Sequence, residues 1–180
     1  MSVFNWVEHV SNVSAAELRR TRAANSDELK HFTDAAGVVS CSAITCNYAL
    51  APLERGRYAL EGFAEARIIQ TCAVTLEDFE VELSEPIIVE FWPAKQIAAT
   101  TEVEVEAVGE DDPEPYTDGR LDIGKVVYEV LVSAIAPFAR KPGAELEQED
   151  TDGAQVATGP ISNNPFAVLS RLKRPPGDSV

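Results

Sequence analysis

The sequence predicts an α+β fold, in which a mainly antiparallel sheet, curled or closed into a partial barrel, is covered by two packed helices and followed by a tail helix. Two long stretches, 57–71 and 78–92, alternate apolar and polar side chains as half-buried strands do. Two others, 27–36 and 121–135, carry apolar side chains at helical spacing. A chain of 180 residues suits one domain of this kind with tails.

The two long strands predict a hairpin that turns around residues 71–78, and a strand over 38–50 leads into it. In the first arm one parity is apolar: Tyr58, Leu60, Ala64, Ala66 and Ile68. In the second arm the apolar parity is Phe79, Val81, Leu83, Ile87, Val89 and Phe91. The opposite parity of the first arm is charged, although Phe63 and Ile69 interrupt it. Because a slip of one residue would turn these apolar side chains to water, we expect a fixed register.

Three shorter elements are expected before the hairpin. Residues 3–10 predict a strand with two core candidates, Phe4 and Trp6. Residues 18–23 fit either a polar edge strand or the end of a helix. The helix over 27–36 is expected to begin after a capping side chain at Asn25 or Ser26 and to stop at Gly37.

The segment after the hairpin is rich in acidic residues. A weaker strand is expected near residues 103–107, with an outer face formed by Glu102, Glu104 and Glu106. Residues 109–119 combine prolines with Glu110, Asp111 and Asp112, a composition typical of a solvated, mobile loop. The clearest helix follows over 121–135, and its apolar stripe is expected to pack on the sheet.

The composition divides the chain into three parts. Residues 1–143 form the expected single α+β domain, and 144–163 read as an acidic flexible linker. Residues 164–180 form a tail whose short helix presents the apolar stripe Phe166, Leu169 and Leu172 and ends near Lys173. A helix this short is marginal alone in water, so it needs a surface of its own domain or of a partner.

Charge is the strongest global property of the sequence. Fifteen Lys and Arg against 30 Asp and Glu give a formal net charge of -15. Such a charge repels phosphate backbones and anionic membranes and attracts basic partners. The alternative explanation is that the charge only keeps the protein soluble. The sequence contains no run of 18 apolar residues, so it predicts no membrane-spanning helix. The first residues lack the pattern of a secretory signal. We therefore expect a cytoplasmic protein that has no membrane contact.

No pattern in the sequence indicates catalysis, a metal or a cofactor. The three cysteines, Cys41, Cys46 and Cys72, are odd in number and suit a reducing compartment. Residues five apart on a regular strand face opposite sides, so Cys41 and Cys46 are not expected to chelate together. Cys72 precedes Glu77 and Asp78, whose charges are expected to raise its pKa. No phosphate-binding glycine loop, nucleophile turn or histidine motif is present, so we expect no enzyme.

Three stretches together resemble the YceD family of large ribosomal RNA subunit accumulation proteins. They are Thr71-Cys72-Ala73-Val74-Thr75-Leu76-Glu77 with Phe79, Leu121-Asp122-Ile123 through Glu129 to Pro137, and Asn164-Pro165-Phe166-Ala167-Val168-Leu169 through Leu172-Lys173. The resemblance implies a factor that supports synthesis, processing or stability of 23S ribosomal RNA and thus large-subunit assembly. It also implies a Cys-x-x-Cys pair at the hairpin, but Thr75 stands at the second position here, and a later cysteine of some members is absent after Pro137.

Two hypotheses for contact with the ribosome follow. In the first, the chain binds a basic large-subunit ribosomal protein or a pre-ribosomal particle through acidic residues and the tail helix: Glu110, Asp111, Asp112, Phe166, Leu169, Leu172 and Lys173. In the second, it binds ribosomal RNA directly through two local arginine clusters: Arg19, Arg20 and Arg22, and in the tail Arg171 and Arg174. The alternative for the charged residues of both sets is that they are solvated charges that serve only solubility, and the alternative for the tail helix is that it docks on the sheet of its own domain.

Overall fold

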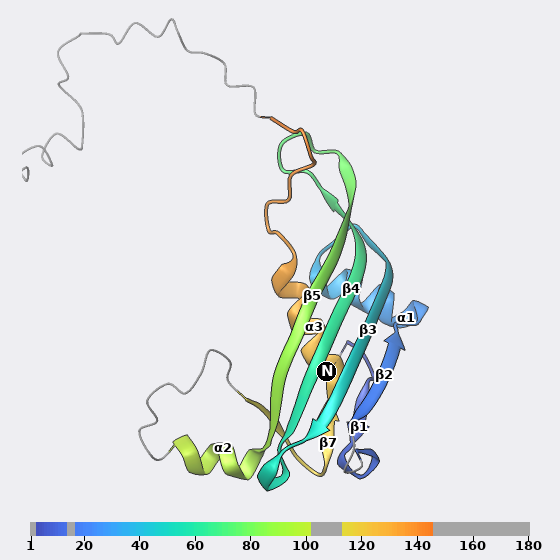
Figure 1. Cartoon of the computed structure of the whole chain (residues 1–180). Coiled ribbons are helices and arrows are strands. Elements are labelled where there is room, and N and C mark those ends of the chain that lie inside the picture. Colours follow the sequence, from blue (N-terminus) through green and yellow to red (C-terminus); the bar gives the residue numbers. More distant parts are fainter. Residues whose placement is uncertain (1–2, 14–16, 102–112, 146–180) are drawn as a thin grey trace, which may run out of the picture. The chain divides into compact units, whose positions relative to one another are not determined.

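The computed structural model describes residues 3–13, 17–101 and 113–145, which lie within one compact unit that ends at Glu145 (Figure 1). The predicted strand near 103–107, the linker from residue 146 onward and the tail helix lie outside the described residues. No described helix is long and apolar enough to cross a membrane.

The core of the fold is a five-stranded sheet in the order β2-β3-β4-β5-β6. Its strands are β2 (Leu18–Ala23), β3 (Ser40–Pro52), β4 (Tyr58–Thr71), β5 (Asp78–Pro93) and β6 (Glu114–Tyr116). The first four are antiparallel neighbours, whereas β6 runs parallel to the end of β5. The predicted α+β fold and hairpin are confirmed, and the sheet is open because β2 and β6 do not pair with each other.

The register of the β4–β5 hairpin separates a buried face from an exposed one. Leu60 lies opposite Val89, and Ile68 lies opposite Val81, on the buried face. Arg67 lies opposite Glu82 on the exposed face, where their side chains form an ion pair of 2.8 Å. The alternation predicted from the sequence is therefore confirmed along both strands.

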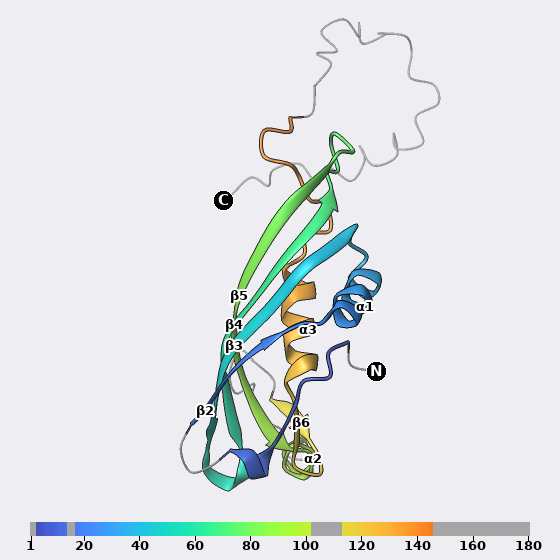
Figure 2. The ribbon, with the colours of Figure 1, turned by 90° about the vertical axis from the view of Figure 1, so that its right-hand side faces the viewer.

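Two helices cover the buried face of the sheet, α1 (Ser26–Ala36) and α3 (Ile123–Ala134) (Figure 2). The Asn25 side chain accepts hydrogen bonds from the amides of the first turn of α1, and Gly37 ends that helix with a φ of 68°. Helix α3 buries Val126, Val127 and Leu131 against the sheet. Both predicted helices are confirmed.

A small second sheet joins the N-terminal segment to the start of α3. Strand β1 (Val7–His9) pairs antiparallel with β7 (Arg120–Asp122). Phe4 and Trp6 are buried beside it, with ring centroids 4.8 Å apart, and Phe4 also stacks on Phe32 of α1. The predicted N-terminal strand is shorter than expected, since only Val7–His9 pair with a neighbouring strand, residues 3–6 precede it without strand pairing, and a 3-10 turn at Val10–Asn12 follows it.

Two segments differ from the sequence prediction. The loop expected over 109–119 is described only from residue 113, and there Glu114–Tyr116 forms β6. Tertiary contacts override the local composition, since Tyr116 packs edge-on against Tyr58 and Lys125 of α3 pairs with Glu114. Helix α2 (Ala94–Thr101), which the sequence analysis did not predict, follows β5 directly. A further 3-10 turn at Glu54–Gly56 joins β3 to β4.

At Gly62, strand β4 lies so close to β3 that a side chain has no room. A Cβ placed on it would lie 2.2 Å from the carbonyl oxygen of Asn47 and 2.8 Å from the Cα of Tyr48, both backbone atoms. Since backbone atoms cannot rotate away, only glycine fits here without moving β3 from β4.

We expect Gly62→Ala to lower the free energy of unfolding by about 2 kcal/mol, because the added methyl forces the two strands apart. Urea denaturation measures this. Gly37→Asn is the matched control, since Gly37 has open space around it and asparagine tolerates its left-handed backbone. A Gly62→Ala variant as stable as wild type would contradict the close strand contact.

Candidate functional site

Most of the residues expected to contact a partner lie outside the described residues. This applies to the acidic set Glu110, Asp111 and Asp112 and to the tail set Phe166, Leu169, Arg171, Leu172, Lys173 and Arg174. The arginine cluster of β2 is described, and so is the whole exposed face of the sheet.

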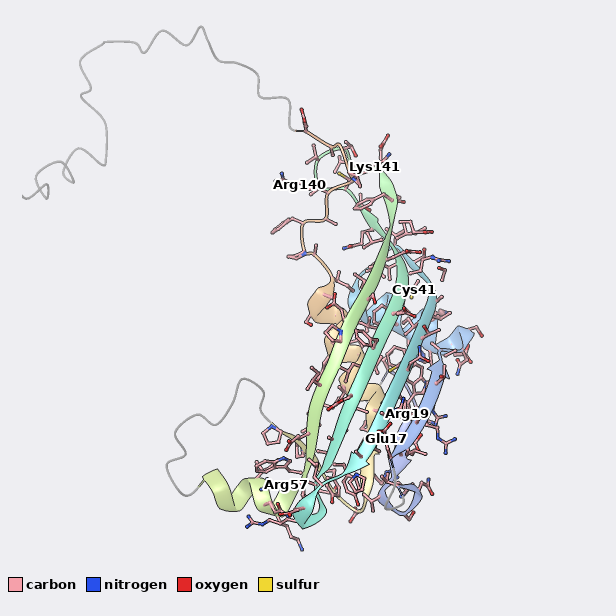
Figure 3. All side chains as sticks on the ribbon, in the orientation of Figure 1. Glu17, Arg19, Cys41, Arg57, Arg140 and Lys141 are labelled. Carbon is pink, nitrogen blue, oxygen red and sulfur yellow. The ribbon has the colours of Figure 1, made fainter. Side chains whose placement is uncertain are left out.

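The three arginines of β2 do not form one surface. Arg20 lies opposite Tyr48 and Arg22 opposite Cys46, both on the helix-covered face, whereas Arg19 lies on the other face. Figure 3 shows Arg19 beside Glu17, with which it forms an ion pair. The structure therefore separates Arg19 from the other two arginines.

Arg22 is engaged by a buried carboxylate, Glu8 of β1. Glu8 is 2% exposed, accepts a hydrogen bond from the Arg22 guanidinium at 2.7 Å and one from the Tyr48 hydroxyl at 2.8 Å, and lies 3.8 Å from Arg20. Burial alone would raise the pKa of Glu8, but the hydrogen bonds from Arg22 and Tyr48 hold it below its ordinary value. Burial raises the pKa of Tyr48 to about 12, so the hydroxyl stays a donor. This group ties β1 to the edge strand β2.

We expect Glu8→Gln to destabilise the fold by about 2 kcal/mol, because it removes the charge that pairs with Arg22. The loss is no larger because Arg22 is partly exposed, so water screens its interaction with Glu8. The folded pKa of Glu8 lies below the ordinary 4.5, so its stabilisation is present above pH 4.5 and is lost as the pH falls through the folded pKa. Urea denaturation at several pH values should therefore show a flatter acid limb for the variant. An unchanged acid limb would mean that Glu8 contributes no such linkage.

The exposed face of the sheet, which we call the outer face, is dominated by carboxylates. It consists of the outward side chains of β2 to β5, which alternate with the core residues. Its acidic members are Glu61, Glu65, Asp78, Glu80, Glu82 and Glu90. Its cations are Arg19, paired with Glu17, and Arg67, paired with Glu80 and Glu82, with Arg57 stacked on Trp92 at its end. Negative charge on this face therefore exceeds positive charge.

Cys72 lies in the turn of the hairpin under the segment that follows α3. Its Sγ accepts backbone N–H groups of Val74 and Thr75, each at 3.4 Å, and of Lys141 at 3.3 Å. The hydroxyl and amide of Thr75, followed by the amide of Lys141, lower the Cys72 pKa to about 6 against the effect of burial. The expectation that Glu77 and Asp78 raise this pKa was wrong, because the local amides dominate and the Lys141 ammonium pairs with Glu77.

The other two cysteines also differ from the expected arrangement. A register shift between Cys41 and Ala43 places Cys41 opposite Ile68, on the same buried face as Cys46. The expectation that they face opposite sides was wrong, because it assumed a strand without a bulge. Burial raises the pKa of both thiols, that of Cys46 to about 12. Within residues 3–13, 17–101 and 113–145, no three His, Cys, Asp or Glu side chains are grouped to hold a metal ion.

We expect one thiolate to appear in the folded protein with a midpoint near pH 6, visible as ultraviolet absorbance. Of the three thiols, only that of Cys72 has a lowered pKa. The step should vanish in Cys72→Ser and persist in Cys46→Ala. A first thiolate step at pH 9 or above would contradict the hydrogen bonding described for Sγ.

The sequence analysis missed two features of the described unit, one buried and one exposed. Glu8 was not singled out, since its partners Arg22 and Tyr48 are distant in sequence and no local pattern links them. The outer face was not recognised as a surface, although two apolar residues at its polar positions, Phe63 and Ile88, were a signal for it.

Comparison with protein families gives a match between residues 60–173 and the model of the large ribosomal RNA subunit accumulation protein YceD. No curated protein and no solved structure matches the chain. The matched region contains β5, β6, β7 and α3 in full and nearly all of β4. Because the match covers more than half of the chain, the protein belongs to the YceD family of large ribosomal RNA subunit accumulation proteins.

Proposed function

We propose that this chain is a cytoplasmic, non-enzymatic factor that supports synthesis, processing or stability of 23S ribosomal RNA, and so large-subunit assembly, by binding a basic ribosomal protein. The family match carries the ribosomal part of the proposal. The excess of carboxylates on a face of the sheet that no described helix covers supports a basic partner.

The charge of the chain favours protein over RNA as the first contact. Non-specific RNA affinity comes mainly from cations that neutralise phosphates, and a chain with a net charge of -15 repels phosphates. Arg22 forms an ion pair with Glu8, and Arg19 forms one with Glu17. Arg19 and Arg22 lie on opposite faces of the sheet. Direct RNA binding through the β2 arginines would therefore have to break existing ion pairs, so it remains the second candidate.

A basic ribosomal protein gains from such a partner before it reaches RNA. Its cationic side chains repel each other and bind RNA non-specifically, and an acidic surface neutralises both effects. The acidic residues Glu110 to Asp112 and the tail helix around Phe166 and Leu169 are proposed to add to this contact on the basis of their sequence.

We expect a tagged full-length chain captured from cells to retain a small basic large-subunit ribosomal protein after ribonuclease treatment. Raising salt from about 50 mM to about 500 mM should release it, because exposed charge pairs are screened. Removal of residues 164–180 should reduce the amount retained.

Loss of all bound protein on ribonuclease treatment would contradict the proposal and favour RNA contact. Arg19→Ala would then be the variant to test for RNA affinity and its salt dependence. Depletion of the chain from cells should lower 23S relative to 16S ribosomal RNA, and an unchanged ratio would contradict the role in accumulation.

A further inference from the structure

The outer face of the sheet is bare in the part of the chain that the structure describes. Helices α1 and α3 lie behind the sheet in Figure 1 and on one side of it in Figure 2, and no described helix lies across the opposite face of β2 to β5. A sheet of this length with one face open to water usually shows polar residues at every outward position.

Two large apolar side chains depart from that rule at the centre of the outer face. Phe63 of β4 is 57% exposed and Ile88 of β5 is 68% exposed. Phe63 lies opposite Pro86 and Ile88 lies opposite Glu61, so the three apolar residues are cross-strand and diagonal neighbours. They form one apolar patch in which neither Phe63 nor Ile88 belongs to the buried core.

The carboxylates around this patch have no cationic partner in the described part of the chain. Glu61 lies directly opposite Ile88, Glu65 is the next outward residue after Phe63, and Glu90 the next after Ile88. Among the described residues none of the three forms an ion pair, in contrast to Glu80 and Glu82, which share Arg67. Outward neighbours on one strand are about 7 Å apart, so each of these carboxylates lies within reach of a side chain that contacts the patch.

Small side chains on β3 leave room beside the patch. The outward positions of β3 include Ala43, Thr45, Asn47 and Ala49, between the longer side chains of β2 and β4. Two shallow hollows of about 390 and 350 Å³ result, one between Arg19 and Glu61 and one between Thr45 and Glu82. Glu65 accepts a hydrogen bond from the Thr45 hydroxyl and Glu90 one from the Trp92 indole, but no described cation pairs with either. The face therefore offers an apolar centre, carboxylates without a described cationic partner, and space for an incoming segment.

Resting on the proposed function, we propose that the outer face is the docking surface for a basic segment of the partner protein, which places an apolar side chain on Phe63 and Ile88 and Lys or Arg side chains on Glu61, Glu65 and Glu90. A second copy of this chain would oppose carboxylate to carboxylate, and RNA would oppose phosphate to carboxylate. Charge complementarity therefore selects a cationic protein segment as the occupant.

The test uses the immobilised full-length chain and, as probe, proteins extracted from purified large ribosomal subunits and freed of RNA. Glu61→Lys is compared with Asp34→Lys, an exposed position on α1 that gives the same change in net charge. Phe63→Ser is compared with Phe138→Ser, an 80% exposed phenylalanine after α3. Thermal unfolding of each variant verifies that it is folded.

We expect Phe63→Ser and Glu61→Lys each to reduce retention of the basic protein at least about tenfold, while Asp34→Lys and Phe138→Ser stay within about twofold of wild type. Equal loss in Glu61→Lys and Asp34→Lys would reduce the effect to net charge and overturn the proposal. Loss in Phe138→Ser with retention in Phe63→Ser would move the contact away from the outer face and also overturn it. If wild type retains no basic protein, the proposed function itself fails.

Discussion

The alternation of side chains along the β4–β5 hairpin is the constraint on which the structure depends. Each inward residue, such as Leu60 or Ile68, lies opposite an inward residue of β5, so one register places the core. The same register places Phe63 and Ile88 on the other side, among carboxylates. A slip of one residue would bury these carboxylates and expose the core, so a single pairing determines both the core and the outer face.

Regular periodicity in the sequence was enough to predict the hairpin, α1 and α3. Each has many apolar residues at one spacing, and Asn25 and Gly37 also mark the ends of α1. Strand β6 was missed because Glu114 and Pro115 favour a loop locally, and distant contacts of Tyr116 and Lys125 decide its structure. The environment of Cys41 depends on a bulge, and that of Cys72 on how the turn directs the Thr75 hydroxyl and the amides of Val74, Thr75 and the distant Lys141 at its sulfur, and neither can be read from the alternation of side chains.

The two charged clusters of the chain have different roles in the structure. Glu8 is buried with Arg22 and Tyr48, and this group stabilises the joint between β1 and β2. Glu61, Glu65 and Glu90 are exposed and surround an apolar patch, and no described cation pairs with them, so they contribute little to stability within the unit. This exposed acidic face, in a member of a ribosomal RNA accumulation family, is the basis on which we propose a cationic protein rather than RNA as the partner.

Footprinting of the outer face in the presence of the proposed cationic partner is the most direct test of this proposal. Hydroxyl radicals would modify the exposed side chains of the free chain, and mass spectrometry would compare them with the chain in its ribosomal complex. We predict protection of Phe63 and Ile88, with Phe138 and the exposed residues of α1 modified as before. Protection confined to Phe138 or to α1, with Phe63 and Ile88 still modified, would contradict docking on the outer face.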